Sequence, residues 1–144
     1  MRLEATLDAP QLIDPSLSIF NVPLGGSVEG PKIKGKIVAP TGDWLRTMPS
    51  GVRRLDVRLT IRTDDDQLVY VSYNGIIQCS KEHLDRLGKG EVIKTDDCYF
   101  ITAPTFDTQS EKYGWLNAVQ AVGKAVSLKR GPDGHIRYDI FAVK

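Results

Sequence analysis

Apolar and polar residues alternate with a period of two along much of this chain. Leu3, Ala5 and Leu7 are separated by acidic and hydroxyl residues, and the stretch 33–37 alternates apolar residues with lysines. The clearest case is 55–62, which places aliphatic side chains on one face and charged or hydroxyl side chains on the other. Such alternation is typical of β-strands with one buried face.

The pattern predicts about eight strands joined by turns. The acidic run at 63–66 and the Pro-Asp-Gly sequence at 132–134 each predict a hairpin, because these residues favour turn geometry. The strands are expected over residues 3–8, 17–22, 33–37, 55–62, 68–73, 98–102, 115–128 and 136–143.

One short helix and three long loops complete the predicted secondary structure. The helix is expected over 81–87, because Ser80 can cap its N-terminus and Gly88 can end it. Three loops are longer than hairpins require and are expected at the mouth of a site. They are residues 23–31, 39–51 and 103–114.

Strands without crossover helices between them favour an antiparallel sheet. About eight such strands in 144 residues can form a closed barrel or a two-sheet sandwich. We favour the barrel, because the strand over 55–61 carries Asp56 and Arg58 on its non-aliphatic face, and a small barrel can enclose a ligand that such a face would contact. The expected fold is all-β: a single closed antiparallel barrel with one short helix, in one domain covering residues 1–144.

Composition and charge narrow the classes of partner. The formal net charge is +1 and no block rich in lysine or arginine occurs, which argues against nucleic acid as a partner. No apolar run approaches the ~20 residues of a membrane helix, and the first residues lack the apolar core of a signal peptide. We therefore expect a cytoplasmic protein that contacts neither nucleic acid nor membranes.

The glycine, histidine and cysteine residues match no cofactor or metal motif. Residues 25–30 are glycine-rich but precede neither a Lys-Ser or Lys-Thr pair nor a predicted helix, so a bend or a close strand approach is favoured. His83 and His135 are far apart, and zinc-ligand spacing is absent. Cys79 and Cys98 are too few for a disulfide scaffold and are interpreted as small buried strand residues. No metal or cofactor is expected.

The charged candidates for catalysis are Asp43, Asp56 and Arg58. Asp43 is expected in the loop after the strand at 33–37. Asp56 and Arg58 are two positions apart on a strand, so their side chains point to the same face. They could form a solvent-exposed salt bridge. Alternatively they point inward, where the arginine would stabilise an acid that acts as a base or binds a polar substrate group.

Aromatic and amide side chains concentrate in the second half of the chain. Trp115 and Asn117 are two positions apart and would share one face of a strand. Aromatic walls with a few fixed polar groups are typical of a pocket for a small organic molecule, although core packing explains each aromatic residue taken alone. The candidate pocket residues are Trp44, Tyr73, Tyr99, Thr102, Phe106, Trp115 and Asn117.

Several short motifs occur together in an order that is similar to a known family. They are Gly42-Asp43-Trp44, Asp56-Val57-Arg58, Tyr99-Phe100 and Trp115-Leu116-Asn117. With these motifs the chain resembles, over nearly its whole length, the family called domain of unknown function 3237 or uncharacterised protein family 0311. It departs from the family pattern at the 64–67 turn, which lacks a glycine, and at Ile101, where the family usually has an arginine.

The resemblance implies a closed barrel of the lipocalin-like or allene-oxide-cyclase-like kind. Barrels of this kind include carriers of small apolar molecules and cofactor-free isomerases, cyclases and lyases. The resemblance also favours the inward alternative for Asp56 and Arg58. The positions that match the family's motif residues are Asp43, Trp44, Asp56, Arg58, Tyr99, Thr102, Phe106, Trp115 and Asn117.

Our leading hypothesis is a cofactor-independent isomerase, cyclase or lyase. It would act by proton transfer on a small hydrophobic, oxygenated compound such as a phenolic, polyketide or terpenoid. Asp56 or Asp43 would be the general base, while Arg58 and Asn117 would stabilise negative charge on an oxygen. The alternatives are a carrier that binds such a ligand unchanged and a scaffold without a ligand.

The last strand predicts self-association. Phe141 and Val143 make it apolar on both faces towards its end. An exposed apolar strand face is a common contact between copies of a small barrel, so we expect a homodimer or a higher oligomer.

Overall fold

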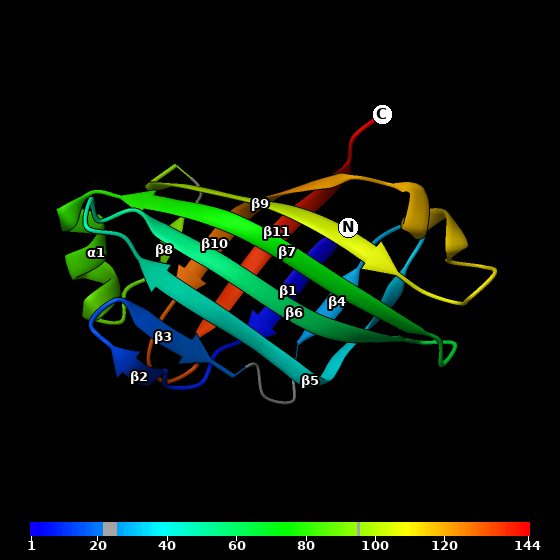
Figure 1. Ribbon diagram of the computed structural model, residues 1–144, viewed down its shortest axis with the longest axis horizontal. Coiled ribbons are helices and arrows are strands. Elements are labelled where there is room, and N and C mark those ends of the chain that lie inside the picture. Colours follow the sequence, from blue (N-terminus) through cyan, green and yellow to red (C-terminus); the bar gives the residue numbers. More distant parts are fainter. Residues whose placement is uncertain (22–25, 95) are drawn as a thin grey trace.

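The computed structural model describes residues 1–21, 26–94 and 96–144, so Pro23 and Gly25 of the predicted 23–31 loop lie outside the described residues. Most of the described chain is β-structure (Figure 1). The elements are β1 (Arg2–Thr6), β2 (Gln11–Asp14), β3 (Leu17–Phe20), β4 (Ser27–Glu29), β5 (Lys34–Thr47), β6 (Arg53–Thr63), β7 (Leu68–Cys79), α1 (Lys81–Gly88), β8 (Ile93–Lys94), β9 (Cys98–Asp107), the 3₁₀ helix η1 (Gly114–Ala118), β10 (Ala121–Lys129) and β11 (His135–Ala142).

Antiparallel pairing closes the sheet into a barrel. Within the described ranges the strands follow the order β2-β3-β5-β4-β1-β11-β10-β9-β7-β6, and β5 also pairs with β6. That pairing closes a ring of eight strands, β5, β4, β1, β11, β10, β9, β7 and β6. The β2–β3 hairpin extends from the second half of β5, and β8 pairs with β10. This confirms the predicted closed antiparallel barrel.

The strand β5 is longer than predicted. It extends through most of 39–51, a segment that the sequence predicts as a loop. A β-bulge between Val38 and Gly42 accommodates extra residues while the strand stays paired with β6. Beyond the bulge, Asp43 lies opposite the buried Val57. Asp43 therefore lies on a barrel strand instead of in a loop.

The segment around Trp115 is a 3₁₀ helix and not the beginning of a strand. β9 continues to Asp107, into the predicted loop 103–114, and η1 precedes β10. Because a 3₁₀ helix turns every three residues, side chains two positions apart point in different directions. The prediction that Trp115 and Asn117 share a strand face is therefore wrong.

The predicted helix and both hairpins are confirmed. The Ser80 hydroxyl caps α1 by accepting a hydrogen bond from the His83 backbone N–H at 3.2 Å. In the two hairpin turns, Asp66 and Asp133 adopt φ values of 61° and 57°. Aspartate tolerates this left-handed conformation better than most residues, so the 64–67 turn forms without a glycine.

The described part of the glycine-rich segment packs closely against the barrel wall. A Cβ atom on Gly26 would overlap the Ile37 side chain and the backbone carbonyl of Glu4. The residues that follow form β4, which pairs with both β1 and β5. At Gly26 the segment thus allows the close strand approach that the sequence predicts.

Inward-facing aliphatic and aromatic side chains fill the barrel, while α1 lies at one end and η1 at the other (Figure 1). Within the described residues, no helix is long and apolar enough to cross a membrane. Phe141, at the end of β11, and Val143 beyond it are 60% and 57% exposed. Self-association through this strand stays a prediction.

Candidate functional site

Each end of the barrel contains a cavity. The cavity near α1 has a volume of about 40 Å³ and contains the charged side chains of Asp43, Arg53 and Arg130. The cavity near η1, of about 130 Å³, has a mainly apolar lining with Lys32 as its charged residue. We therefore take the first, named the Asp43 cavity, as the candidate site. Its remaining lining residues are Leu7, Phe20, Leu45, Leu55, Ile77, Phe100, Leu128, Ile136 and Tyr138.

Asp43 carries an unusual carboxyl group. Its Oδ1 atom is buried and makes no hydrogen bond with any described residue. Burial raises the pKa of Asp43 to about 7, a hydrogen bond from the Asp56 backbone N–H opposes this shift, and the negative charge of Asp56 adds to it. The carboxyl group is therefore divided between its acid and carboxylate forms near neutral pH.

Tyr73 and Tyr138 lie beside this carboxyl group. Their rings meet edge to face with centroids 5.9 Å apart, and their hydroxyl groups hydrogen-bond to each other. Burial raises the pKa of both phenols. The charge of Asp43 raises the two pKa values further, so both phenols stay neutral hydrogen-bond donors at physiological pH.

Two half-buried arginines complete the polar part of the cavity. Arg53 is the first residue of β6, and Arg130 directly follows β10. Burial lowers the pKa of both groups, and the charge of Arg53 lowers that of Arg130 further. Neither forms an ion pair with any residue that the structure describes. The Arg130 guanidinium lies 5.8 Å from the centroid of the Phe20 ring.

A larger groove, of about 530 Å³, adjoins the Asp43 cavity. The two share Leu7, Phe20 and Arg130 in their linings. The other walls of the groove come from the segment after β1 and from the turn between β10 and β11. A ligand lying in the groove would thus reach the carboxyl group past Arg130.

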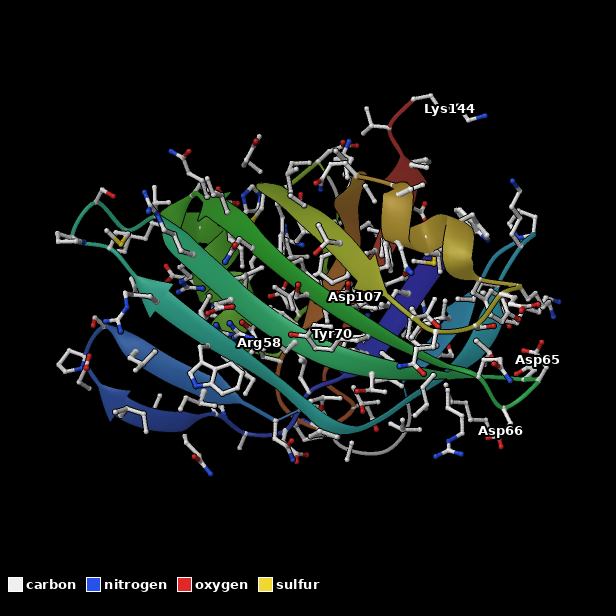
Figure 2. The ribbon with its side chains drawn as sticks, turned by 45° about the vertical axis from the view of Figure 1, so that its right-hand side comes forward. Arg58, Asp65, Asp66, Tyr70, Asp107 and Lys144 are labelled. Atoms are coloured by element: carbon white, nitrogen blue, oxygen red, sulfur yellow. A yellow bond between two sulfur atoms is a disulfide. The ribbon has the colours of Figure 1, made fainter. Side chains whose placement is uncertain are left out.

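The predicted inward orientation of Asp56 and Arg58 is wrong. Their side chains form an ion pair of 3.0 Å on the outer face of β6, with 48% and 51% of the side-chain surface exposed. Figure 2 shows Arg58 at the surface. Leu55 and Val57 are buried, and strand alternation then directs the residues between and beyond them outward. The exposed salt bridge, the other alternative, is what forms.

Two of the predicted aromatic wall residues also face outward. Trp44 is on the outer face of β5, and the Arg58 guanidinium lies 5.8 Å from its ring centroid. Tyr99 is 58% exposed on β9. Neither lines a described cavity, and Tyr73, although buried and directed inward, also lines none of them.

The other predicted pocket residues have separate places. Thr102 is buried beside Gly123. The Thr102 hydroxyl donates a hydrogen bond to the Gly123 carbonyl at 3.4 Å. Phe106 and Trp115 line the cavity near η1. Asn117 exchanges two hydrogen bonds of 2.9 Å with the backbone of Thr108 and so holds the loop before η1. The structure does not bring these residues to Asp43.

Sequence reasoning missed Tyr138, Arg53 and Arg130. Tyr138 is two positions from the buried Ile136 and from the buried Ile140, so the three side chains share the inward face of the strand. Arg53 has the same parity as the inward side chains of β6, so the same rule would have found it. A register shift in β10 between positions 125 and 127 breaks the alternation before Arg130, and the sequence contains no such indication for that residue.

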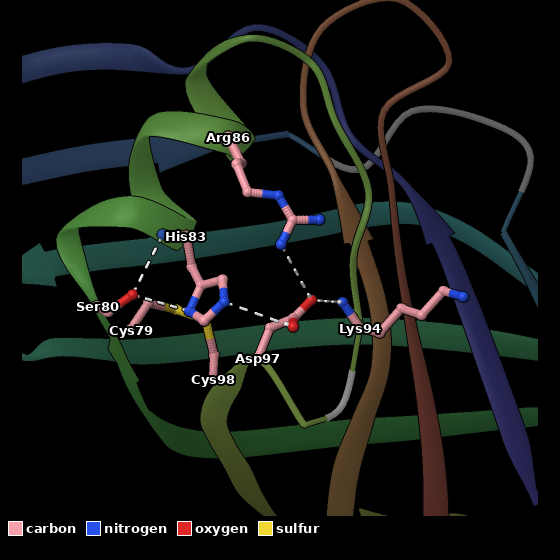
Figure 3. The surroundings of a disulfide bond; sticks show 7 residues. All are labelled: Cys79, Ser80, His83, Arg86, Lys94, Asp97 and Cys98. Atoms are coloured by element: carbon pink, nitrogen blue, oxygen red, sulfur yellow. Dashed lines mark hydrogen bonds and ion pairs between the residues drawn. A yellow bond between two sulfur atoms is a disulfide. The ribbon is translucent and has the colours of Figure 1, made fainter.

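The two cysteines form a disulfide that the sequence analysis did not predict. Cys79 and Cys98 lie opposite each other on β7 and β9, with Cα atoms 4.5 Å apart (Figure 3). They lie on strands as expected, but they are half-buried and paired. The bond closes the segment that contains α1 and β8, at the same barrel end as the Asp43 cavity.

A serine, a histidine and an aspartate lie in a row beside the disulfide (Figure 3). Ser80 Oγ is 2.8 Å from His83 Nδ1, and Asp97 Oδ1 is 3.5 Å from His83 Nε2. Ser80 is the helix cap, while Asp97 also accepts the Lys94 backbone N–H and lies 3.9 Å from Arg86. These contacts fasten α1 to the segment before β9, and we assign them a structural role.

The sequence and this geometry match known proteins. A family described as a protein of unknown function, DUF3237, matches residues 1–143. The chain belongs to this family. A UPF0311 protein of Clostridium acetobutylicum is 34% identical over 93 residues, which are 65% of this chain and 59% of the relative. A UPF0311 protein of Rhodopseudomonas palustris is 34% identical over 102 residues, which are 71% of this chain and 67% of the relative.

Solved structures share the fold of this DUF3237 chain. A Rhodopseudomonas palustris protein of unknown function has a TM-score of 0.88 at 28% identity, covering 99% of this chain and 93% of its own. A beta-barrel like protein of Acinetobacter baumannii has a TM-score of 0.74 at 30% identity, covering 99% and 92%. An enzyme from Penicillium herquei has a TM-score of 0.66 at 19% identity, covering 98% and 91%, which shows a shared fold alone.

The Asp43 cavity of this DUF3237 barrel combines three kinds of chemistry. Asp43 can accept or donate a proton near neutral pH, Tyr138 can donate a hydrogen bond, and the two arginines supply positive charge. Apolar side chains surround these groups and strengthen their electrostatic interactions by excluding water. The arrangement can therefore support proton transfer on a molecule that carries oxygen.

Proposed function

We propose that this DUF3237 barrel binds a small hydrophobic, oxygenated molecule and transfers a proton within it, using Asp43 as the general base. The outcome would be an isomerisation, a cyclisation or an elimination. The observation that carries the proposal is the Asp43 carboxyl group, which has an unpartnered buried oxygen and a pKa raised to about 7. A base with that pKa is suited to work at neutral pH.

The proton and the charge each have a place in this scheme. Asp43 takes a proton from a carbon or oxygen of the substrate, and the electron pair left behind moves onto a substrate oxygen. The hydroxyl group of Tyr138, which lines the cavity with Asp43, is a neutral donor for that oxygen, and the Tyr73 ring packs against Tyr138. The protonated Asp43 then returns the proton to a different atom, which completes an isomerisation or a ring closure.

The apolar walls support a hydrophobic substrate. The Phe100 ring lies edge to face against Tyr138 with a centroid separation of 5.4 Å. Phe20 lies between the cavity and the groove and lines both. Because the Asp43 cavity is only about 40 Å³, it fits the reacting part of a molecule whose remainder lies in the groove. That a fungal enzyme has this fold is compatible with catalysis.

The test is hydrogen–deuterium exchange of an enolisable aromatic ketone, 2-tetralone, followed by proton NMR in D₂O. The wild-type protein should accelerate loss of the α-proton signal, and Asp43→Asn should lower the rate at least about a hundredfold. Tyr138→Phe should lower it about tenfold or more through loss of one donor.

The matched control is Asp107→Asn, because Asp107 is an exposed carboxylate on the outer face of β9 (Figure 2). It should leave the exchange rate within about twofold of wild type, as expected for a surface change. Loss of exchange in Asp56→Asn with full activity in Asp43→Asn would move the base to the outer face and contradict the proposal. Saturable binding of 2-tetralone without any exchange would indicate a carrier instead.

A further inference from the structure

The arginines of this protein fall into two groups. Most of those on the outer face have acidic partners: Arg2 pairs with Asp139 at 2.8 Å, and Arg137 pairs with Glu4 at 2.6 Å. The exceptions are exposed to solvent: Arg46 donates a hydrogen bond to the Ser16 hydroxyl, and Arg54 forms no ion pair with a described residue. The same holds for Arg58 with Asp56, for Arg62 near the end of β6 and for Arg86 of α1. Paired surface arginines need no ligand to explain them.

Arg53 and Arg130 differ from this group. Both line the Asp43 cavity, both are half-buried, and neither has an ion pair or hydrogen bond with the described part of the chain. They come from β6 and from the end of β10, strands that are separated in the ring by β7 and β9. Two cations from different walls thus converge on one cavity.

This convergence of two positive charges is unfavourable by itself. Partial burial removes water from both guanidinium groups, and the charge of Arg53 further destabilises the charged form of Arg130. Asp43 lines the same cavity but forms no ion pair with either group. A bound anion between the two guanidinium groups would provide the missing charge and accept their hydrogen bonds.

We propose that Arg53 and Arg130 form a subsite for the carboxylate of a hydrophobic organic acid, whose apolar body lies against Phe20 and Phe100. This names the substrate class for the site and rests on the proposed function only for the reaction at Asp43. A carboxylate is planar and singly charged, and it can accept paired hydrogen bonds from guanidinium groups. A phosphate dianion would bring a larger negative charge towards the Asp43 carboxyl group, so we favour the carboxylate.

The test is isothermal titration calorimetry with benzoate, with benzamide as the neutral analogue. Wild-type protein should bind benzoate at least about tenfold more tightly than benzamide, because charge-assisted hydrogen bonds to arginine are lost in the amide. Arg53→Gln and Arg130→Gln should each weaken benzoate binding about tenfold or more. Equal binding of benzoate and benzamide, or unchanged binding in both variants, would overturn the proposal.

The matched control is Arg54→Gln, because Arg54 is the exposed neighbour of Arg53 on the same strand. It should leave benzoate affinity within about twofold, as expected for a solvated charge. Arg130→Lys keeps the charge but loses the planar donor pair, so weakened benzoate binding in this milder variant supports the subsite even if a glutamine variant does not fold. Tighter binding of inorganic phosphate than of benzoate, measured by the same calorimetry, would overturn the choice of a carboxylate.

Asp43→Asn separates this inference from the proposed function. The variant should keep benzoate affinity at or above that of wild type, since it removes a negative charge from the cavity, while ketone exchange is lost. Absence of exchange in every protein combined with arginine-dependent benzoate binding would refute the proton-transfer proposal and leave the carboxylate subsite standing.

Discussion

Replacing Asp43 with asparagine should make the protein more stable at neutral and alkaline pH. The folded protein raises the pKa of this carboxyl group from 3.8 to about 7, chiefly through burial. The folded state therefore keeps a proton that the unfolded chain loses above about pH 4, so increasing pH favours unfolding. The destabilisation is absent below the unfolded pKa, grows up to about pH 7 and is then complete.

The size of the effect follows from the two pKa values. Each pKa unit corresponds to about 1.4 kcal/mol, so full ionisation of Asp43 costs the folded state about 4 kcal/mol. Asparagine is a suitable neutral replacement, because the Oδ1 atom of Asp43 makes no hydrogen bond with a described residue that the substitution could remove. Asp43→Asn should match wild type near pH 4 and exceed its unfolding free energy by about 4 kcal/mol near pH 8.

Urea unfolding followed by tryptophan fluorescence from pH 4 to pH 8 measures this difference directly. Tyr73, Tyr138 and Asp56 also interact electrostatically with Asp43, but none of them is altered in the variant, so the comparison isolates one carboxyl group. Asp107→Asn on the outer face serves as the control and should give a small difference at every pH. A difference for Asp43→Asn that stays below about 1 kcal/mol at pH 8 would refute the desolvation of Asp43 and with it the assigned base.

Three further predictions concern other parts of the barrel. Arg53→Met should raise the unfolding free energy by about 1 kcal/mol while weakening benzoate binding, because it removes an unpaired cation from the cavity; urea unfolding checks this, and a loss of stability would show a structural role. The Cys79→Ser/Cys98→Ser double variant should have an unfolding free energy about 3 kcal/mol below that of wild type, the value expected for a disulfide that closes a loop of this length. Dithiothreitol should destabilise wild type but not the variant. Gly123→Ala should cost about 1–3 kcal/mol, because the new methyl group would overlap the Thr102 hydroxyl, and the cost should shrink in a Thr102→Ala background if that contact is responsible.

The alternation of apolar residues was sufficient to predict an antiparallel all-β fold. It did not distinguish a barrel from a sandwich, and the inward polar face at Asp56 and Arg58 that favoured the barrel lies on the outside. Most strands bury one face, so the alternation of apolar residues within each strand indicates which side faces the interior. Turns that contain aspartate follow β6 and β10 and indicate where these strands end. The helix α1 was also predictable from local sequence, since Ser80 caps its first turn and Gly88 is its last residue. These features depend on neighbours a few residues away, which is the range over which sequence patterns are informative.

The candidate site was predictable only in part. Asp43 and Tyr73 were among the candidates, but β5 continues across Pro40 through a bulge, and no local pattern indicates that a strand would resume there. The outward orientation of Asp56 and Arg58 follows from the alternation itself, because Leu55 and Val57 beside them are buried. A shared motif contains no information about which side of a strand faces the interior, so local parity is the more reliable guide.

The two ends of the barrel differ in whether their charged side chains have hydrogen-bond or ion-pair partners. At the η1 end, Asp65 accepts hydrogen bonds from Thr63, Lys112 and Tyr113, which hold its pKa well below the usual range and join the β6–β7 turn to the segment before η1. At the α1 end, the acidic and basic side chains that line the Asp43 cavity lack such partners within the described chain. Unpaired buried charges lower the stability of a protein, and such destabilising features are typical of sites that bind a ligand or perform chemistry. This contrast favours binding and chemistry at the α1 end and a stabilising role for the η1 end.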